Sequence, residues 1–481
     1  MHRKHTDNIG RRKNRPLSWK GAVWGTIESF SRFFMAFLFG DKKDSAAAFF
    51  NDGKTCYQRG DMDRAIQKYT RAIELKPDLP GAFNGRGCAY CRKGDLDHAF
   101  QDFNKAIELN PVYASAYCGR GTAYYRKGDY DNSIQDCSKA IELDPDLTVA
   151  YYNRATAYQA KGYFDHAIQD YNRAIELDPE DERSYCGRGI AHFGKGDSDH
   201  AVRDFTKAIE LQPDFMEAFW GRGSAYKKRE DLDRAIQDYS KAIELKPDEI
   251  AGYGNRGCAY LDRGDFDSAV QDFSKAIELK PDDERGYYNR GCAHYARGDF
   301  YSAIKDFSKA IELKPDSASA YSWRAAVYYY TGNYDRAIGD YAKACELPPN
   351  TIGDVSHCVV LFLAKMHVGQ DGKPALVAGL KDAKEGDWMT QVAKMYLGEI
   401  TPEGFLAAIS DKDTERNNER KCAASYYMGE FYLLRGEKEC ALELFRQCIA
   451  TGLSTSAEYN SAKAELHRLA GLESAQEPNR G

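Results

Sequence analysis

The sequence predicts an all-α solenoid of helix–turn–helix repeats with a helical C-terminal extension. The first observation is a fixed interval of 34 residues between successive prolines, at Pro77, Pro111, Pro145, Pro179, Pro213, Pro247, Pro281, Pro315 and Pro349. The second observation is that each interval holds two stretches of helical periodicity separated by a turn. A unit of this length buries its apolar face only against its neighbours, which is typical of a stacked solenoid.

The seventh repeat shows why each unit should form two helices. Its first half has the i, i+4, i+7 spacing of one helix face and ends at a glycine, and an aspartate then caps the second helix, whose inward face ends at a proline. The residues of this pattern are, in order, Tyr253, Gly257, Tyr260, Gly264, Asp265, Ala269, Phe273, Ala276 and Pro281. The small residues indicate close backbone approach, where a bulky side chain would cost roughly 1–3 kcal/mol.

These positions resemble the tetratricopeptide repeat (TPR) family, whose pattern runs from an aromatic residue through glycine, tyrosine, alanine, an aromatic residue and alanine to proline. The second repeat meets it with Phe83, Gly87, Tyr90, Ala99, Phe103, Ala106 and Pro111. The sixth repeat meets it with Phe219, Gly223, Tyr226, Ala235, Tyr239, Ala242 and Pro247. Nine such units occupy residues 46–351. The resemblance implies a right-handed superhelix that binds other proteins.

The resemblance also implies where a partner would bind. In TPR proteins the first helices line the concave face, and the second, fifth, ninth and twelfth positions of each unit point inward. The predicted groove residues are Asn84, Tyr125, Tyr152, Thr156, Arg183, Phe193, Trp220, Ser224, Tyr288, Tyr295 and Tyr329. Tyr and Trp offer large contact area and Ser and Asn can bond an extended backbone, so this lining suits a peptide or a partner's helix. The alternative is that these aromatics only pack against the next repeat.

Two rows of opposite charge also follow the repeat period. One position of the first helices holds Arg86, Arg120, Arg154, Arg188, Arg222, Arg256, Arg290 and Arg324. One position of the second helices holds Asp102, Asp136, Asp170, Asp204, Asp238, Asp272, Asp306 and Asp340. We expect ion pairs between adjacent helices, with the arginine stems covering apolar surface. The alternative is two rows that are solvated independently.

Composition and charge exclude several classes of function. The chain has 481 residues, of which 43% are hydrophobic and 29% charged, as in a helical protein with several domains. A net charge of −6 gives no general attraction to phosphate, so we expect no nucleic-acid partner. The 13 cysteines are odd in number and scattered through predicted helices. This usage indicates a reducing compartment and favours the cytoplasm.

The sequence shows no recognisable catalytic motif, so we expect neither an enzyme nor a cofactor or metal. Cys88 and Cys91 form a CxxC pair, but it lies inside a repeat helix without a second pair. His98, His166 and His200 share one position of the repeat, which repetition alone explains. The sequence also lacks a glycine-rich phosphate loop and a nucleophile elbow.

Residues 1–43 form a basic, aromatic-rich segment. The first twenty residues hold seven lysines and arginines against one acid, and residues 22–39 place apolar side chains on one face of a helix, opposite Glu28 and Arg32. A membrane-spanning helix here would carry those two charges at a cost of roughly 2.5–3.5 kcal/mol each. Three interpretations stay open: a helix that lies on or anchors in a membrane, a helix that caps the first repeat on Phe49 and Phe50, and a targeting signal.

A different helical region follows the nine repeats. Residues 352–420 read as a helical connector, with a buried helix over Val355–Met366, a shorter helix from Pro374, a third after Thr401, and a solvated link over Asp411–Lys421. Residues 421–470 read as a tenth unit with a capping helix, and residues 471–481 as a flexible tail. The tenth unit places Gly429, Tyr432, Gly436, Ala441, Phe445 and Cys448 at the family's positions.

The stretch YYMGEFYLLRGEKECALELFRQCIATG at 426–452, with EYNSAKAEL at 458–466, resembles the end of bacterial TPR proteins of the NlpI-like lipoprotein type. This resemblance implies an adaptor role and a bacterial source. The lipid-attachment cysteine is missing here, so the outer-membrane location of those relatives is not implied. We therefore expect a non-catalytic scaffold or adaptor for unidentified proteins, located in the cytoplasm with membrane contact through residues 1–40 as an open alternative. Two other functions stay open, an enzyme with its site in residues 352–420 and a solenoid that binds single-stranded RNA.

Overall fold

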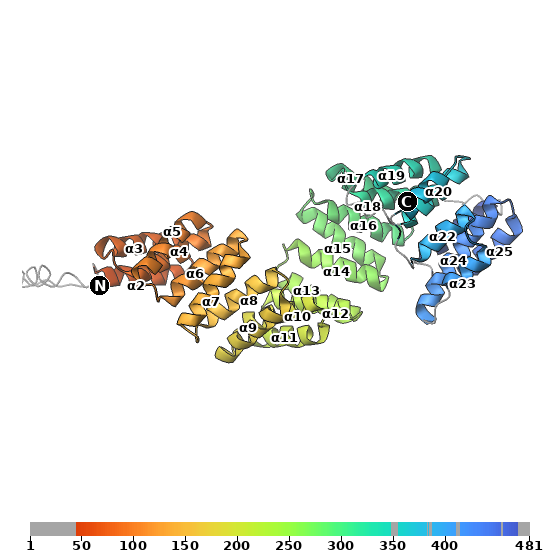
Figure 1. Ribbon diagram of the computed structural model, residues 1–481. Helices are drawn as coiled ribbons and strands as arrows, with labels where there is room; N and C mark the ends of the chain where they lie inside the picture. The colour runs from red at the N-terminus through yellow and green to blue at the C-terminus, as the bar shows by residue number, and fades with distance from the viewer. Residues whose placement is uncertain are drawn as a thin grey trace, which may run out of the picture. The chain divides into compact units, whose positions relative to one another are not determined.

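The small and apolar residues of each repeat bring its two helices together as a hairpin, and the computed structural model is built from such hairpins (Figure 1). It describes residues 45–347, 355–381, 383, 387–409, 414–453 and 456–469, and every regular element among these residues is an α-helix. The predicted all-α fold is confirmed.

Nine consecutive hairpins follow the 34-residue period. They are α2 Ala46–Gln58 with α3 Met62–Leu75, α4 Pro80–Lys93 with α5 Leu96–Leu109, α6 Ala114–Lys127 with α7 Tyr130–Leu143, α8 Thr148–Ala160 with α9 Phe164–Leu177, α10 Glu182–Lys195 with α11 Ser198–Leu211, α12 Met216–Lys228 with α13 Leu232–Leu245, α14 Ile250–Arg263 with α15 Phe266–Leu279, α16 Glu284–Ala296 with α17 Phe300–Leu313, and α18 Ala318–Tyr330 with α19 Tyr334–Glu346. Successive hairpins within each unit also pack on each other, as expected for a stacked solenoid.

In most of the nine hairpins the turn is set by one glycine and one aspartate. In the seventh repeat Gly264 has a φ of 82°, a left-handed conformation that costs glycine little. Asp265 then caps α15, because its side chain accepts a hydrogen bond from the backbone N–H of Ser268 at 3.3 Å. In the sixth repeat the glycine is replaced by Glu230, which adopts the same left-handed conformation with a φ of 62°.

A second glycine allows the two helices to approach each other. A Cβ atom on Gly257 of α14 would lie 2.7 Å from Cε1 of Phe273 in α15, and Phe273 is fully buried. Gly429 of the C-terminal region has the same relation to Phe445, at 2.5 Å. The close approach predicted from the small residues is therefore present in the repeats and in the tenth unit.

The chain divides into two compact units, residues 1–213 and 214–481. The first unit holds the hairpins from α2 to α11, and the second holds those from α12 to α19 together with the C-terminal helices. The prediction of one uninterrupted superhelix through all nine repeats stays a prediction, as do the predicted domain boundaries.

The C-terminal helices are α20 Val355–His367, α21 Lys373–Leu380, α22 Trp388–Leu397, α23 Pro402–Ile409, α24 Thr414–Leu434, α25 Lys438–Ala450 and α26 Ala457–Leu469. The helices expected after Val355, Pro374 and Thr401 are present, and α24 and α25 form the expected tenth hairpin. Helix α22 was not predicted from the sequence.

The predicted solvated link over Asp411–Lys421 is helical from residue 414 on, where it forms the first turns of α24, and Asn418 and Lys421 are exposed. The glutamate, arginine and lysine residues of 414–421 have good helix propensity, and the buried segment that begins at Cys422 gives the helix a stable part from which to extend. High charge alone therefore did not mark a loop.

The predictions for residues 1–43 and for the tail at 471–481 lie outside the described residues. Among the helices that the structure describes, none combines the length and the apolar character needed to cross a membrane.

Candidate functional site

The first helices of successive repeats lie on the inner side of each stack. In the first unit α2, α4, α6, α8 and α10 contact one another in turn, and in the second unit α12, α14, α16 and α18 do the same. Between successive second helices of the described hairpins no contact of comparable extent occurs. A stack curves toward the side on which its helices are closest, so the first helices line the inner face of each unit, and we call these two surfaces the inner faces.

In the first unit the predicted groove residues fall on α4, α6, α8 and α10. Only Arg183 is exposed. The half-buried ones are Asn84, Tyr125, Tyr152, Thr156 and Phe193. Their intermediate exposure differs from the full burial of the residues that hold each hairpin together, such as Phe103 and Ala106.

Tyr152 and Arg183 join two repeats on the inner face of the first unit. The Arg183 guanidinium lies 5.5 Å from the ring centroid of Tyr152, and Asp181 accepts a hydrogen bond from Arg183 Nε at 3.0 Å. Tyr152 also packs edge-on against the ring of Tyr171, with centroids 5.7 Å apart. Burial raises the pKa of Tyr152, so its hydroxyl stays protonated and can donate to an acceptor. The pair is a pre-positioned cation beside an aromatic surface.

In the second unit Trp220, Ser224 and Tyr288 are half-buried on α12 and α16. Ser224 donates a hydrogen bond to the carbonyl of Trp220 at 3.0 Å and accepts one from the hydroxyl of Tyr239 at 3.1 Å. Tyr288 packs edge-on against Phe307, with centroids 6.0 Å apart, and burial raises its pKa to about 12. These side chains are held in place from below and keep part of their surface open.

Tyr295 and Tyr329 differ from the other predicted groove residues because the chain itself covers them. They are 7% and 6% exposed, and the hydroxyl of Tyr426 in α24 donates a hydrogen bond to that of Tyr329 at 3.2 Å. Both tyrosines line a cavity of about 370 Å³ whose lining also includes residues of α20, α24 and α26. The inner face therefore ends at the eighth repeat, where the C-terminal helices begin to occupy it.

The predicted ion pairs between the arginine and aspartate rows are confirmed. Each arginine binds its aspartate with two hydrogen bonds of 2.6–2.9 Å. Each guanidinium also lies 5.5–5.9 Å from the centroid of the aromatic ring three residues before it. The bonds to Asp102 raise the pKa of Arg86, and the same contacts recur along the stack.

The sequence analysis missed a third partner of these arginines. Nη1 of Arg86, Arg120, Arg154, Arg188, Arg256, Arg290 and Arg324 donates to a side chain sixteen residues earlier, at 2.6–3.0 Å, on the second helix of the preceding repeat. The acceptors are Thr70, Asn104, Ser138, Asn172, Ser240, Ser274 and Ser308. Each such arginine therefore joins three helices, and the restriction of this position to Ser, Thr or Asn was the available signal.

The cysteine and histidine residues singled out in the sequence follow the repeat. Burial raises the pKa of Cys88 to about 12, which disfavours the reactive thiolate, and Cys91 is buried. His98 stacks on Tyr90 with centroids 5.1 Å apart. In the fifth hairpin a histidine takes the place of that tyrosine, so His200 stacks on His192 at 4.9 Å.

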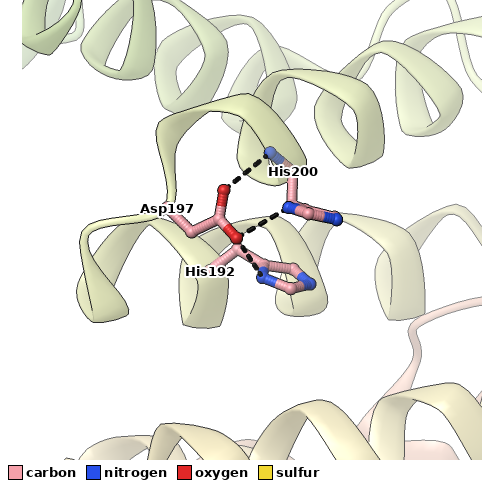
Figure 2. Close-up of side chains that lie close together, drawn as sticks. All are labelled: His192, Asp197 and His200. Carbon is pink, nitrogen blue, oxygen red and sulfur yellow. Dashed lines mark hydrogen bonds and ion pairs between the residues drawn. The ribbon is translucent and has the colours of Figure 1, made fainter.

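This substitution creates a polar cluster at the turn between α10 and α11. Figure 2 shows the carboxylate of Asp197 between the two imidazole rings. Its Oδ2 lies 2.6 Å from Nδ1 of His200 and 3.8 Å from Nδ1 of His192, while Oδ1 accepts from the backbone N–H of His200 at 3.1 Å. Burial lowers the pKa of His192, so this ring is neutral near pH 7. One carboxylate oxygen already caps the helix, and half of the His200 side chain is exposed.

Comparisons with known proteins agree with the repeat pattern. Sequence models described as "Tetratricopeptide repeat" match residues 114–147, 148–181, 186–250 and 318–350. Models described as "TPR repeat" match residues 53–93, 87–128, 257–298 and 291–332. Together these matches cover more than half of the chain.

Several solved TPR structures are similar to parts of the chain. MamA is 28% identical over 35% of this chain and 93% of its own, with a TM-score of 0.30. YrrB, titled a TPR protein with an unusual peptide-binding site, is 23% identical over 38% of this chain and 95% of its own, with a TM-score of 0.33. A tetratricopeptide repeat protein from Parabacteroides merdae is 22% identical over 51% and 97%, with a TM-score of 0.41. By the repeat matches and the helical hairpins, the chain belongs to the tetratricopeptide repeat family.

Proposed function

We propose that this protein is a non-catalytic adaptor that holds an extended peptide or a helix of a partner protein on the inner faces of its repeats. TPR repeats are generally protein–protein interaction modules. The observation that carries the finer proposal is a series of half-buried aromatic side chains on the first helices, fixed from below and open above, in particular Tyr152, Trp220 and Tyr288.

The chemistry of these side chains suits a polypeptide ligand. Tyrosine and tryptophan are enriched among residues that dominate binding energy, because they bury a large area with little loss of side-chain freedom. Ser224 and Thr156 already bond within their own helices, so they contribute shape more than new hydrogen bonds. Arg183 adds a positive charge held by Asp181, which favours a partner segment with an acidic residue or a backbone carbonyl at that point.

The proposal places the binding site away from the C-terminal end of the repeats. Tyr295 and Tyr329 are covered by the chain's own helices, so they support the fold and are not offered to a partner. The adaptor role that the C-terminal resemblance implies, a cytoplasmic location, and membrane contact through residues 1–40 are parts of the same proposal. Under it, the repeats capture one protein and the N-terminal segment decides where the adaptor resides.

The test uses the full chain as bait and measures the affinity for the protein it retains. The double variant Trp220→Ala with Tyr288→Ala should weaken binding by roughly 30-fold or more, since a buried aromatic anchor contributes about 2 kcal/mol or more. Tyr301→Ala is the matched control, because Tyr301 is 82% exposed on the second helix α17, away from the inner face. Unchanged affinity in a double variant with intact helicity would place binding on another surface.

A further inference from the structure

Three ionisable side chains meet inside the C-terminal part of the second unit. They are His367 at the end of α20, Glu430 in α24 and Glu465 in α26, and one ligand atom of each lies within 4.8 Å of the others. Their side chains are 8%, 0% and 8% exposed. Carboxylates are rarely buried to this degree without a compensating charge, so the cluster requires a physical explanation.

Each carboxylate of this cluster has one oxygen that is bound and one that is poorly satisfied. Glu430 Oε2 lies 3.1 Å from Nε2 of His367, while its Oε1 is buried without a hydrogen-bond partner among the described residues. Glu465 Oε2 accepts from Nε and Nη2 of Arg468 at 2.9 and 2.5 Å, while its Oε1 has the hydroxyl of Tyr334 at 3.4 Å. Leaving a buried acceptor unpaired is costly, more so when it is charged.

The cluster is also short of positive charge. Arg468 compensates one carboxylate, and the other has only the imidazole of His367, whose charge depends on a proton. Burial raises the pKa of Glu430. Burial lowers the pKa of His367, but the hydrogen bond and the charge of Glu430 outweigh it, and the pKa is raised overall.

Neighbouring side chains fix the orientation of the possible ligands. The ring of His367 stacks on Tyr334 with centroids 4.5 Å apart and an interplanar angle of 5°, and the edge of Tyr329 contacts it at 5.9 Å. Arg468 fixes Glu465 through a single oxygen, which leaves the other oxygen with only the hydroxyl of Tyr334 at 3.4 Å. Such outer contacts are what position imidazole and carboxylate ligands around a metal ion.

We propose that His367, Glu430 and Glu465 bind one divalent transition-metal ion, with Zn²⁺ as the ion that the donor set fits. The ligands are Nε2 of His367, a carboxylate oxygen of Glu430, and Oε1 of Glu465. One imidazole with two carboxylates favours Zn²⁺ over Mg²⁺ or Ca²⁺, which prefer oxygen ligands alone. Ligand atoms around Zn²⁺ lie roughly 3–3.5 Å from one another, and the His367 and Glu430 atoms already do so.

The ion would have a structural role, independent of the proposed binding of a partner. Its three ligands come from three helices that are far apart in the sequence, and the site is closed to solvent. Because the ion would replace a proton on His367, its affinity should fall at acidic pH. Binding to the folded chain alone would stabilise the C-terminal helices in proportion to the concentration of free metal.

The experiment titrates Zn²⁺ into the full chain after removal of metal with EDTA, using calorimetry and elemental analysis. We expect about one tight site per chain, weakened by roughly 100-fold or more in Glu430→Gln and in Glu465→Gln. The control is His200→Gln, which removes a ligand from the more exposed cluster of His192, Asp197 and His200 and should leave the tight site unchanged. Loss of the tight site in His200→Gln but not in Glu430→Gln would overturn the proposal, as would a chain with no tight site.

A second measurement needs no variant, so it holds if one of the glutamine variants fails to fold. Co²⁺ bound to the metal-free full chain should give a spectrum of nitrogen and oxygen ligation and should be displaced by Zn²⁺. A strong thiolate-to-cobalt band would assign the metal to cysteines instead, and the Cys422 and Cys448 sulfurs, 3.1 Å apart, are a thiol pair to check. That band, or a spectrum unchanged from free Co²⁺, would also overturn the proposal.

Discussion

The repeat hairpins and the C-terminal helices bury their apolar surface in different ways. In the repeats each core is a small cluster between neighbouring hairpins, such as the one made by Cys91, Ala99, Phe103 and Ala123. From the ninth repeat onward a single large cluster runs from Ala325 in α18 to Ala462 in α26. A stack of local cores should unfold in parts, whereas a shared core should unfold as one unit.

The two regions also treat charge differently. In the repeats charged residues form the same pair again and again, with the aspartate buried and the arginine about one-fifth exposed. In the C-terminal region His367, Glu430 and Glu465 form one buried cluster, whereas the comparable group in the described repeats, His192, Asp197 and His200, is more exposed. In the repeats, charged residues therefore contribute to stability through the same ion pair in each hairpin. In the C-terminal region the buried charges lie in one cluster.

The largest effect should come from removing the central aromatic residue of a hairpin in each region. Phe103→Ala and Phe445→Ala both delete a fully buried ring next to a glycine, at an expected cost of roughly 3–5 kcal/mol. Hydrogen exchange should rise only around α4 to α6 in the first variant. In the second it should rise throughout α20 to α26, because these helices share one core.

If Phe445→Ala raised exchange only in α24 and α25, the C-terminal helices would behave like another repeat, and the contrast between the regions would be lost. Each variant serves as the control for the other, because the two phenylalanines have the same place in their hairpins.

A smaller effect is expected from breaking one ion pair of the repeats. Arg256→Leu would leave the carboxylate of Asp272, which is 5% exposed, without its two hydrogen bonds. We expect Arg256→Leu and Asp272→Leu each to lower the free energy of unfolding by roughly 2–3 kcal/mol, measured in urea. The double variant should lose less than the sum of the two single losses.

The control pair is Lys275 with Glu278 on the same helix, which is largely exposed and should show no measurable coupling. Strictly additive losses for Arg256 and Asp272 would mean that the contact contributes no pairwise energy.

The glycines allow a sharper comparison within one helix. Gly257→Ala places a methyl group 2.7 Å from the buried ring of Phe273 and should cost roughly 1–3 kcal/mol. Gly254, three residues earlier in α14, has no atom within 4 Å of that position, so Gly254→Ala should stabilise by up to about 1 kcal/mol through helix propensity. Thermal unfolding of the two variants should therefore shift in opposite directions, and a shared direction would rule out steric contact as the cause.

The sequence predicted the repeats well because each position of the pattern occurs in nine repeats, so its typical residue can be recognised. Proline spacing placed the hairpins, and the matching rows of arginine and aspartate predicted the ion pairs that the structure shows. The third partner of these arginines was missed, since serine, threonine and asparagine at a partly exposed helix position also occur without any contact.

The C-terminal region was harder to predict, because its contacts join residues far apart in a sequence that occurs once. Tyr426 reaches Tyr329 across 97 positions, and Glu430 reaches His367 across 63. The family pattern makes Tyr295 and Tyr329 groove residues, but it contains no information about helices that cover them. The residues of the proposed metal site likewise form no short sequence motif, because they are far apart in the sequence.

The smallest expected effect concerns the one described residue other than glycine with a positive φ. Glu230 holds a φ of 62° at a turn where eight other repeats have glycine with φ between 72° and 93°. The left-handed conformation costs a residue with a Cβ atom roughly 1–2 kcal/mol. A glycine avoids this cost but loses more backbone entropy on folding, which offsets part of the stabilisation. Glu230→Gly should therefore stabilise the sixth hairpin by about 1 kcal/mol in urea unfolding. Glu230→Ala removes the same side chain without relieving the backbone, so equal stabilisation by both variants would assign the effect to the glutamate side chain and not to its backbone conformation.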